Sequence, residues 1–296
     1  MIEEIAGIRA KAEQASEFRY RCPVMDAKRE AVVVVSQSGE TADTLGALRE
    51  AKRKGLLTVG VVNVVGSTVA RETDAGIYTH AGPEIAVAST KAFLAQVLTF
   101  SLLALYLGRQ RAMSLADGQR FVADLHSLPD KIRRALGDAE HVEAVARKYA
   151  GVRDFLYLGR KYNAPLASEG ALKMKEIAYI HAEGYAAGEM KHGPIAMLDS
   201  EFPVLAIVPR DSVYEKTRTG IEEVKARLAP VIAVATEGDT DMKRLVDDVL
   251  WIPEAPEPLS PIVAAAPLQL LAYYAAVAKG YDPDRPRNLA KSVTVE

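Results

Sequence analysis

The segment Ala31-Val32-Val33-Val34-Val35-Ser36-Gln37-Ser38-Gly39-Glu40-Thr41 joins an apolar run to a short turn rich in hydroxyl groups. The run has the length and β-branched composition of a buried strand, and the turn after it predicts the start of a helix. At such a turn the free N–H groups and the positive end of the helix dipole point at the same place. Ser36, Ser38 and Thr41 add hydroxyl donors, and Gly39 permits a close approach of the backbone. The sequence therefore predicts a site for an anion.

The composition of this turn favours a sugar phosphate over a nucleotide. It contains neither the G-x-x-x-x-G-K-[ST] pattern nor the G-x-G-x-x-G pattern, so hydroxyls and amides would hold the phosphate without a loop lysine. From the turn alone an alternative stays open, in which Ser38 or Thr41 only caps the helix.

The bulk composition predicts two domains and a small-molecule partner. The chain has 296 residues, 49% of them apolar and 26% charged, with a formal net charge of -2. Nothing in that balance predicts a nucleic-acid surface or a disordered acidic tail. The single cysteine, Cys22, cannot form an internal disulfide, and no His or Cys cluster has the spacing of metal ligands. We therefore expect a reducing, cytoplasmic location and a site without metal or cofactor.

The sequence also predicts neither a signal peptide nor a membrane span. The chain starts with a charged segment of helical character instead of a basic and then apolar leader. Its longest apolar runs, such as 100–107, are shorter than a bilayer requires.

Short β-branched runs alternate with longer helical patterns, which predicts an α/β fold with parallel sheets flanked by helices. A polar, helical stretch from about Ser114 to Tyr149, which contains Pro129, separates two such sets. We therefore expect a first domain at 1–125, a connecting helical segment at 126–149 and a second domain at 150–296 that includes the tail. The predicted strands are 31–35, 57–62, 155–158, 204–208, 231–235 and 249–252.

The two halves of the chain also resemble each other. Gly82-Pro83-Glu84-Ile85-Ala86-Val87-Ala88 precedes an apolar helix that ends at Gly108, and Ser260-Pro261-Ile262-Val263-Ala264-Ala265-Ala266 begins another that ends at Gly280. This pattern predicts a duplicated unit that closes with a buried helix. The likeness is short and rich in alanine, so coincidence stays an alternative.

The second half carries a helical pattern in which Glu169, Lys173 and Glu176 share one face, with Lys175 turned away from it. A carboxylate that moves a proton between adjacent carbons benefits from a nearby lysine. Glu and Lys four residues apart are also common on exposed helices. A solvated salt bridge is therefore the alternative for this segment taken alone.

Two further residues could take part in catalysis. His192 lies between Lys191 and a Gly-Pro turn and could protonate a ring oxygen to open a cyclic sugar, although a lone histidine in a loop is often just exposed. Lys291 stands among small and apolar residues in the tail. If the tail packs into the site, partial desolvation favours a neutral, nucleophilic amine that forms an imine with an open-chain ketose. The remaining histidines are assigned no role.

These pieces, in this order, resemble the isomerase half of the glutamine:fructose-6-phosphate amidotransferases, the glucosamine-6-phosphate synthases, which is built from two sugar-isomerase (SIS) domains. The resemblance covers essentially the whole chain. Its most specific parts are Ser36 through Thr44, Gly82 through Phe93, Glu169 through His192 and Pro286 through Glu296.

The resemblance implies a role for each candidate residue in binding and isomerising a hexose 6-phosphate, namely fructose, glucosamine or glucose 6-phosphate. Glu176 would move the proton between C1 and C2, and Lys173 and Glu169 would support that transfer. His192 would assist ring opening, entering from a partner subunit, so the resemblance implies a homodimer. Lys291 would form the ketose imine. The phosphate and sugar would be bound by Ser36, Gln37, Ser38, Thr41, Val87 and Ala290.

Two departures from the family pattern shape our expectations. The glutaminase domain with its N-terminal cysteine is absent from this sequence and Cys22 cannot replace it, so we expect no glutamine hydrolysis. The first strand of the first SIS domain, with its Cys-Gly-Thr-Ser turn, is missing as well. Residues 1–19 have helical more than strand character, and we expect a truncated first domain whose activity is in question.

The main hypothesis is therefore an isomerase module of glucosamine-6-phosphate synthesis. A non-catalytic SIS module that binds sugar phosphates is the first alternative, and a structural fragment that only dimerises is the second. A sugar-phosphate sensor needs the hydroxyl turn but neither the acid–base helix nor the tail lysine. The residues that distinguish an isomerase from such a sensor are therefore Glu176, Lys173 and Lys291.

Overall fold

The structure is a computed structural model that describes residues 1–21 and 23–292. The statements about Cys22 and about the last four residues of the tail motif lie outside the described residues. The chain packs into two compact units. Unit 1 is Met1–Gly118 together with the tail from Asn288, and unit 2 is Gln119–Arg287.

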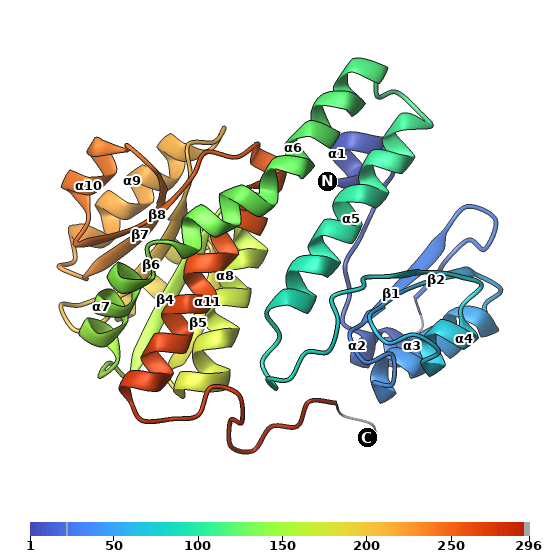
Figure 1. Cartoon of the computed structure of the whole chain (residues 1–296), viewed down its shortest axis with the longest axis horizontal. Helices are drawn as coiled ribbons and strands as arrows, with labels where there is room; N and C mark the ends of the chain where they lie inside the picture. The colour runs from blue at the N-terminus through green and yellow to red at the C-terminus, as the bar shows by residue number, and fades with distance from the viewer. Residues whose placement is uncertain (22, 293–296) are drawn as a thin grey trace. The chain divides into compact units, whose positions relative to one another are not determined.

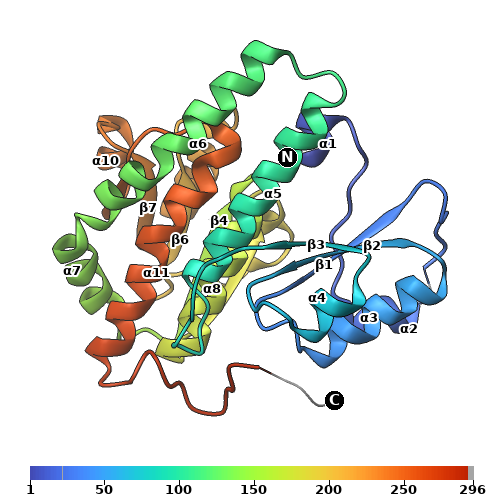
Figure 2. The ribbon, with the colours of Figure 1, turned by 45° about the vertical axis from the view of Figure 1, so that its right-hand side comes forward.

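Unit 1 contains a parallel sheet with the strand order β1-β2-β3 (Figure 1). Figure 2 shows α2, α3 and α4 along one side of this sheet, and α1 packs against α5. Before β1 the described residues form two short helices joined by loops, and no strand, in line with the helical character predicted for 1–19. The elements are α1 (Ile2–Ala6), α2 (Ala15–Arg21), β1 (Ala31–Ser36), α3 (Ala42–Arg53), β2 (Leu57–Val62), α4 (Thr68–Glu72), β3 (Ala75–Tyr78) and α5 (Lys91–Arg109).

Helix α3 forms because its sequence supplies both a start and an apolar face. Thr41 stands before it in an extended conformation, and the buried residues Thr44, Ala47, Leu48 and Ala51 recur at the spacing of one helical face. Leu48 and the strand residues Val34 and Val62 pack in one buried cluster. This packing fixes the start of α3 directly after the turn that follows β1.

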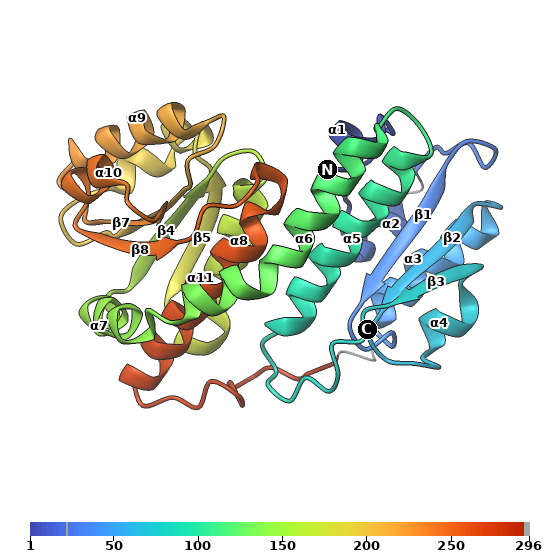
Figure 3. The same cartoon turned by 45° about the horizontal axis from the view of Figure 1, so that its top comes forward.

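Unit 2 contains a five-stranded parallel sheet with the order β5-β4-β6-β7-β8. Figure 3 shows α8 and α11 on one face of the sheet and α9 and α10 on the other. The elements are α6 (Leu115–Leu136), which begins in unit 1, α7 (Ala139–Tyr149), β4 (Asp154–Gly159), α8 (Asn163–Lys173), the π-helix η1 (Met174–Ala178), β5 (His181–Ala186), the 3-10 helices η2 (Glu189–His192) and η3 (Pro194–Met197), β6 (Val204–Val208), α9 (Tyr214–Lys225), β7 (Val231–Thr236), α10 (Thr240–Leu245), β8 (Asp248–Ile252), the 3-10 helix η4 (Glu257–Leu259) and α11 (Ser260–Ala278).

The α/β fold with two parallel sheets is confirmed, and all six predicted strands are present. The sequence missed β3 and β5. β3 has four residues, two of them exposed, and β5 reads His-Ala-Glu-Gly-Tyr-Ala, so neither carries a strong apolar pattern. The polar stretch 114–149 forms α6, a single helix that includes Pro129, and α7, which packs against α11.

Two helices are longer and more apolar than the sequence analysis allowed. By length and composition alone, these helices, Lys91–Arg109 and Glu257–Ala278, could cross a membrane. The prediction that every apolar stretch is too short for a bilayer is therefore wrong. In the apolar stretch of 18 residues within Glu257–Ala278, 67% is buried inside the protein, as in the core helix of a globular domain. In the corresponding stretch within Lys91–Arg109, 28% is buried. Length and composition alone are weak evidence for a membrane span, because a core helix passes the same test.

Candidate active site

The turn after β1 brings its hydroxyl groups together. Ser36 Oγ lies 3.1 Å from Thr41 Oγ1 and accepts a hydrogen bond from the Gly39 N–H at 3.0 Å. Ser38 Oγ accepts one from the Glu40 N–H at 3.2 Å. Thr41 is the N-cap residue of α3, but its side chain makes no capping hydrogen bond. The predicted strand, turn and helix are thus present, and the hydroxyls bind within the turn.

Gly39 is required at its position for two reasons. Its φ of +68° is a left-handed conformation that L side chains rarely adopt. A Cβ atom there would also lie 2.1 Å from Ser67 Oγ and 2.6 Å from Ser67 Cβ, and Ser67 is buried. The turn and the start of α4 therefore pack too closely for any other residue.

Further hydrogen bonds fix the turn against the neighbouring loops. The Asn63 N–H donates to the Gln37 carbonyl at 3.2 Å, and Asn63 Nδ2 donates to the Gly82 carbonyl at 2.8 Å. Glu40 Oε1 accepts from the Thr68 N–H at 2.7 Å, and this hydrogen bond lowers the pKa of the Glu40 carboxyl. The loops that follow β1, β2 and β3 thus form one connected edge of the sheet.

The C-terminal tail lies on this edge. Lys291 Nζ donates to the Ala86 carbonyl at 2.7 Å and to the Val87 carbonyl at 3.4 Å. Ser292 Oγ donates to Ser38 Oγ at 3.2 Å, whereas Ala290 is exposed. The predicted phosphate turn, Val87 and the predicted imine-forming lysine thus come together in unit 1. The tail belongs to this unit although the expected division grouped it with 150–296.

Sequence reasoning missed Glu84, which contacts the same lysine. Glu84 Oε2 lies 3.6 Å from Lys291 Nζ, and the Glu84 side chain is only 3% exposed. The residue stands in the segment 82–93 that carries the family resemblance, between β3 and α5. The available signal was a carboxylate placed shortly before an apolar helix, where it can accept the free N–H groups.

In unit 2 the predicted acid–base residues also come together. Lys173 Nζ lies 2.5 Å from Glu176 Oε2 and 3.4 Å from Glu169 Oε1. Lys173 is buried, and its side chain is 4% exposed. Lys175 is exposed, as predicted. The burial of Lys173 argues against a solvated salt bridge on an exposed helix face.

The backbone under these residues departs from the predicted helix. The last turn, Met174–Ala178, is a π-helix, so Glu176 does not lie on a regular α-helical face with Glu169. The turn ends at Tyr179, whose φ of 53° is left-handed. Tyr179 OH accepts the Arg287 N–H at 2.7 Å, and the Arg287 guanidinium stacks over the Tyr179 ring. π-turns are rare and often occur at functional sites.

His192 ends the short helix η2 and is exposed. Its neighbour Lys191 forms an ion pair with Glu223 at 2.6 Å. Within the described residues no group of three or more His, Cys, Asp or Glu side chains could hold a metal ion.

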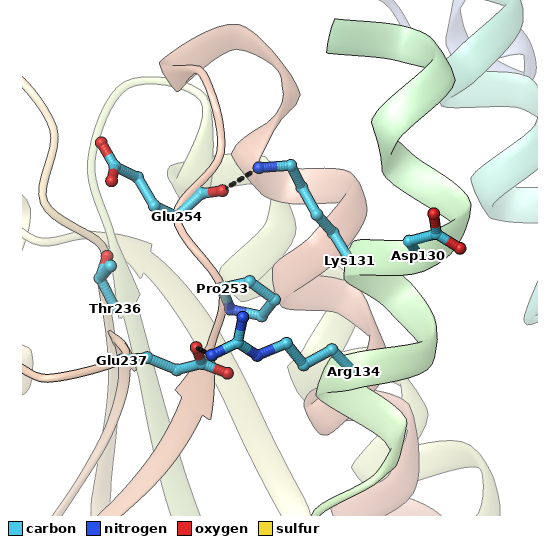
Figure 4. A pocket seen from close by; sticks show the side chains of 7 residues that line it. All are labelled: Asp130, Lys131, Arg134, Thr236, Glu237, Pro253 and Glu254. Atoms are coloured by element: carbon cyan, nitrogen blue, oxygen red, sulfur yellow. Dashed lines mark hydrogen bonds and ion pairs between the residues drawn. The ribbon is translucent and has the colours of Figure 1, made fainter.

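Unit 2 also contains a cavity of about 420 Å³ between α6 and the segments that follow β7 and β8 (Figure 4). Its two cationic side chains are already bound, because Lys131 donates to the Glu254 carbonyl and Arg134 forms an ion pair with Glu237. None of the candidate site residues lines it. The lining residues are Asp130, Lys131, Arg134, Thr236, Glu237, Pro253 and Glu254.

Comparisons with known proteins agree with this architecture. The SIS domain family matches residues 1–106 and 149–279. The glutamine–fructose-6-phosphate aminotransferases (isomerizing) of Chlorobaculum tepidum and Thermus thermophilus are each 52% identical to the chain over its whole length. The chain covers 48% and 49% of these two proteins and therefore spans about half the length of the curated relatives that it matches.

Solved structures extend the comparison. The C-terminal domain of glucosamine-fructose-6-phosphate aminotransferase from Francisella tularensis matches with a TM-score of 0.91 and 36% identity, over 96% of this chain and 80% of that one. A glucosamine-6-phosphate deaminase from Thermotoga maritima shares the fold, with a TM-score of 0.77 and 24% identity over 99% of this chain and 84% of that one. The chain therefore belongs to the SIS domain family, in the group formed by the C-terminal, isomerase halves of the glutamine–fructose-6-phosphate aminotransferases.

Proposed function

We propose that this chain binds a hexose 6-phosphate and carries out the sugar-isomerase step of glucosamine-6-phosphate synthesis, in which fructose 6-phosphate and ammonia give glucosamine 6-phosphate. The names of the relatives, which specify fructose 6-phosphate, support this substrate class. One observation carries the proposal: the amine of Lys291 and the hydroxyl of Ser292 lie with the hydroxyl turn in one unit. A phosphate held by the turn would bring the sugar to that amine.

The phosphate would be bound by hydroxyls and by backbone N–H groups. Ser36, Ser38 and Thr41 supply the hydroxyls, Gln37 lies between them, and the first turn of α3 supplies N–H groups and its dipole. Val87 and Ala290 would lie along the sugar. Ser292 would give up its hydrogen bond to Ser38 when phosphate enters.

The reaction would begin with opening of the sugar ring and would proceed through an imine. His192, contributed by the second copy of a homodimer, protonates the ring oxygen and opens the sugar. Lys291 loses its proton, its amine adds to the C2 carbonyl and a water molecule leaves. Ammonia then displaces the lysine and keeps the C=N bond. Glu176 removes a proton from C1 and returns one to C2, while the C1 hydroxyl loses a proton and the imine nitrogen gains one, which converts the ketose imine into the amino aldose.

The acid–base cluster of unit 2 is included in the proposed reaction because its residues have the chemistry that a proton transfer needs. Glu176 is a carboxylate beside the buried lysine Lys173, whose Nζ lies 2.5 Å from Glu176 Oε2. The buried Lys173 would support Glu176, and a sensor that only binds the phosphate would have no use for either residue.

Glu176→Gln tests the proposal. The variant should lose about 10²- to 10⁴-fold in the conversion of fructose 6-phosphate and ammonia to glucosamine 6-phosphate, because the amide cannot accept the C1 proton. Binding of glucosamine 6-phosphate, measured by calorimetry, should stay near wild type. Glu215→Gln, on the exposed side of α9, is the matched control and should leave turnover unchanged. Unchanged turnover in Glu176→Gln would remove this residue from the mechanism.

A further inference from the structure

We infer that Glu84 is a positioning residue, which holds the Lys291 amine at the edge of the hydroxyl turn. The inference rests on the proposed function, because it concerns the lysine that would form the imine. Glu84 lies in the loop between β3 and α5, far from Lys291 in sequence, and reaches it within unit 1.

The two oxygens of Glu84 have different partners. Oε1 accepts the Thr90 N–H at 2.6 Å and lies 3.4 Å from the Ala92 N, so it ties the carboxylate to the first turn of α5. Oε2 accepts from Ser89 Oγ at 3.1 Å and faces Lys291 Nζ at 3.6 Å. The helix start thus fixes the carboxylate, and the carboxylate in turn offers one oxygen to the lysine.

The surroundings keep Glu84 charged. Burial raises the pKa of its carboxyl, but the hydrogen bonds from Thr90, Ala92 and Ser89 and the charge of Lys291 outweigh burial, so the pKa stays below its ordinary value. A carboxylate that is 3% exposed needs a positive partner. Lys291 is the cation that lies against it.

The environment of Lys291 explains why the tail needs this anchor. Its other two contacts are the carbonyl oxygens of Ala86 and Val87, which are neutral acceptors. Glu84 Oε2 lies at 3.6 Å, so it acts on Lys291 through charge attraction, and partly buried charge pairs are screened little by salt. Glu84 therefore adds an attraction that the two carbonyl oxygens do not supply.

Unit 2 contains a comparable ion pair that does not involve the tail. Glu257 begins η4, directly before α11, and its Oε1 lies 2.9 Å from Lys161 Nζ. Glu257 Oε1 also accepts from Ser212 Oγ at 2.7 Å. A carboxylate before the long helix thus binds a lysine from another loop in both units. Only in unit 1 does that lysine come from the tail.

Glu84→Gln tests the inference in the whole chain. The amide oxygen can still accept the Thr90 N–H, so α5 keeps its start while the charge opposite Lys291 is lost. Trapping of Lys291 by fructose 6-phosphate and borohydride, at saturating sugar, should fall about tenfold. The dissociation constant for inorganic phosphate should change less than about twofold, because the hydroxyl turn is untouched.

Two variants separate charge from structure. Glu84→Asp retains the carboxylate and should trap within about threefold of wild type. Glu257→Gln removes the corresponding ion pair of unit 2 and should trap as wild type does. Trapping by Glu84→Gln equal to wild type, or a loss in Glu84→Asp as large as in Glu84→Gln, would overturn the role of the charge.

Tryptic cleavage after Arg287 and Lys291 gives a readout that does not depend on the reaction. Glu84→Gln should release the tail several-fold faster than wild type, and Glu257→Gln should not. An unchanged cleavage rate overturns the inference. If wild type itself is not trapped by any hexose 6-phosphate, the proposed function fails, and the cleavage rates alone then decide whether Glu84 holds the tail.

Discussion

The two units contain the same series of elements but use the loop after its first strand differently. The series β1-α3-β2-α4-β3-α5 of unit 1 has its counterpart in β6-α9-β7-α10-β8-α11 of unit 2, with helices of 12 residues after the first strand and 19 residues at the end in both. The predicted duplication is therefore present in the topology. The first loop reads Ser36-Gln37-Ser38-Gly39-Glu40-Thr41, and its counterpart reads Pro209-Arg210-Asp211-Ser212-Val213.

In unit 2 the polar side chains of the corresponding loop bind other residues of the same unit. Arg210 pairs with the fully buried Asp239 at 3.1 Å, and Asp239 also caps α10 through the Met242 N–H. Ser212 donates to Glu257. In unit 1 the small hydroxyl side chains of Ser36 and Thr41 contact each other, and neither carries a charge. The shared backbone thus carries an internal ion pair in unit 2 and, at the same place in unit 1, the uncharged turn that we propose as the phosphate site.

The first strands differ as well. Every residue of β6 is buried, because β6 pairs with β4 on one side and β7 on the other. In the sheet that the described residues form, β1 pairs with β2 alone, and Val35 is 37% exposed. Both β1 and β6 consist almost entirely of apolar residues. The difference in their burial therefore follows from the neighbours that each strand has in its sheet.

The largest expected effect concerns α8, which belongs to the part of unit 2 that precedes this shared series. Lys173→Met leaves the carboxylates of Glu169 and Glu176 together without their cation, so the free energy of unfolding of unit 2 should fall by about 3 kcal/mol. The fluorescence of Trp251, the single tryptophan of the chain, reports urea unfolding of this unit. Lys175→Met, at an exposed neighbour, should change the midpoint little. Equal midpoints for the two variants would contradict a buried ion pair.

The next effect compares one glycine from each unit. Gly39 and Gly238 both have positive φ, but a Cβ at Gly39 meets Ser67 whereas a Cβ at Gly238 meets nothing within 4 Å. Gly238→Ala should therefore lose about 1 kcal/mol of stability from backbone strain alone. Gly39→Ala should lose about 2 kcal/mol and weaken inorganic phosphate binding about tenfold, since Ser67 cannot move freely.

Urea unfolding followed by circular dichroism and phosphate titration by calorimetry would measure both glycine variants. Phosphate binding that weakens equally in Gly39→Ala and Gly238→Ala would contradict a site confined to unit 1. Loss of stability alone, with phosphate affinity retained in Gly39→Ala, would show that the hydroxyl turn is only structural.

The smallest effect concerns a matched pair of aspartates before the last strand of each series. Hydrogen bonds from the hydroxyl and N–H of Thr58 lower the pKa of Asp74. Burial raises the pKa of Asp247, but Lys225 and the Val231 N–H outweigh it, so that this pKa is lowered too. A lowered folded pKa stabilises the fold above the ordinary value of 3.8, and this stability is lost as the pH falls through the folded pKa.

Asp247→Asn should therefore flatten the fall of the Trp251 unfolding midpoint in urea below about pH 4. Asp74→Asn removes the corresponding carboxylate of unit 1. It should leave the urea unfolding midpoint of Trp251 unchanged, and it should flatten the fall at low pH of the unfolding midpoint measured by circular dichroism. A Trp251 midpoint that responds equally to both variants would mean that the two units unfold as one.

The sequence alone determined the elements that depend on neighbouring residues. The apolar run at 31–35 and the turn after it predicted the strand, the loop and the helix start, because strand length, hydroxyl content and Gly39 are local properties. The apolar series at 204–208 and 231–235 predicted the central strands in the same way. β5 escaped prediction because its polar sequence forms a strand only by pairing with β4.

Only the tertiary structure decided how the charged side chains are used. The spacing of Glu169 and Lys173 allowed either a solvated pair or a buried one, and the packing of α8 against the sheet and α11 made it buried. The helix also ends in a π-helix, Met174–Ala178, which contains Glu176. Glu84 has its partner Lys291 in a distant tail, whose contact with Ala86 joins residues 205 positions apart in the sequence. Burial and charge pairing depend on which distant segments meet, and no local pattern encodes that meeting.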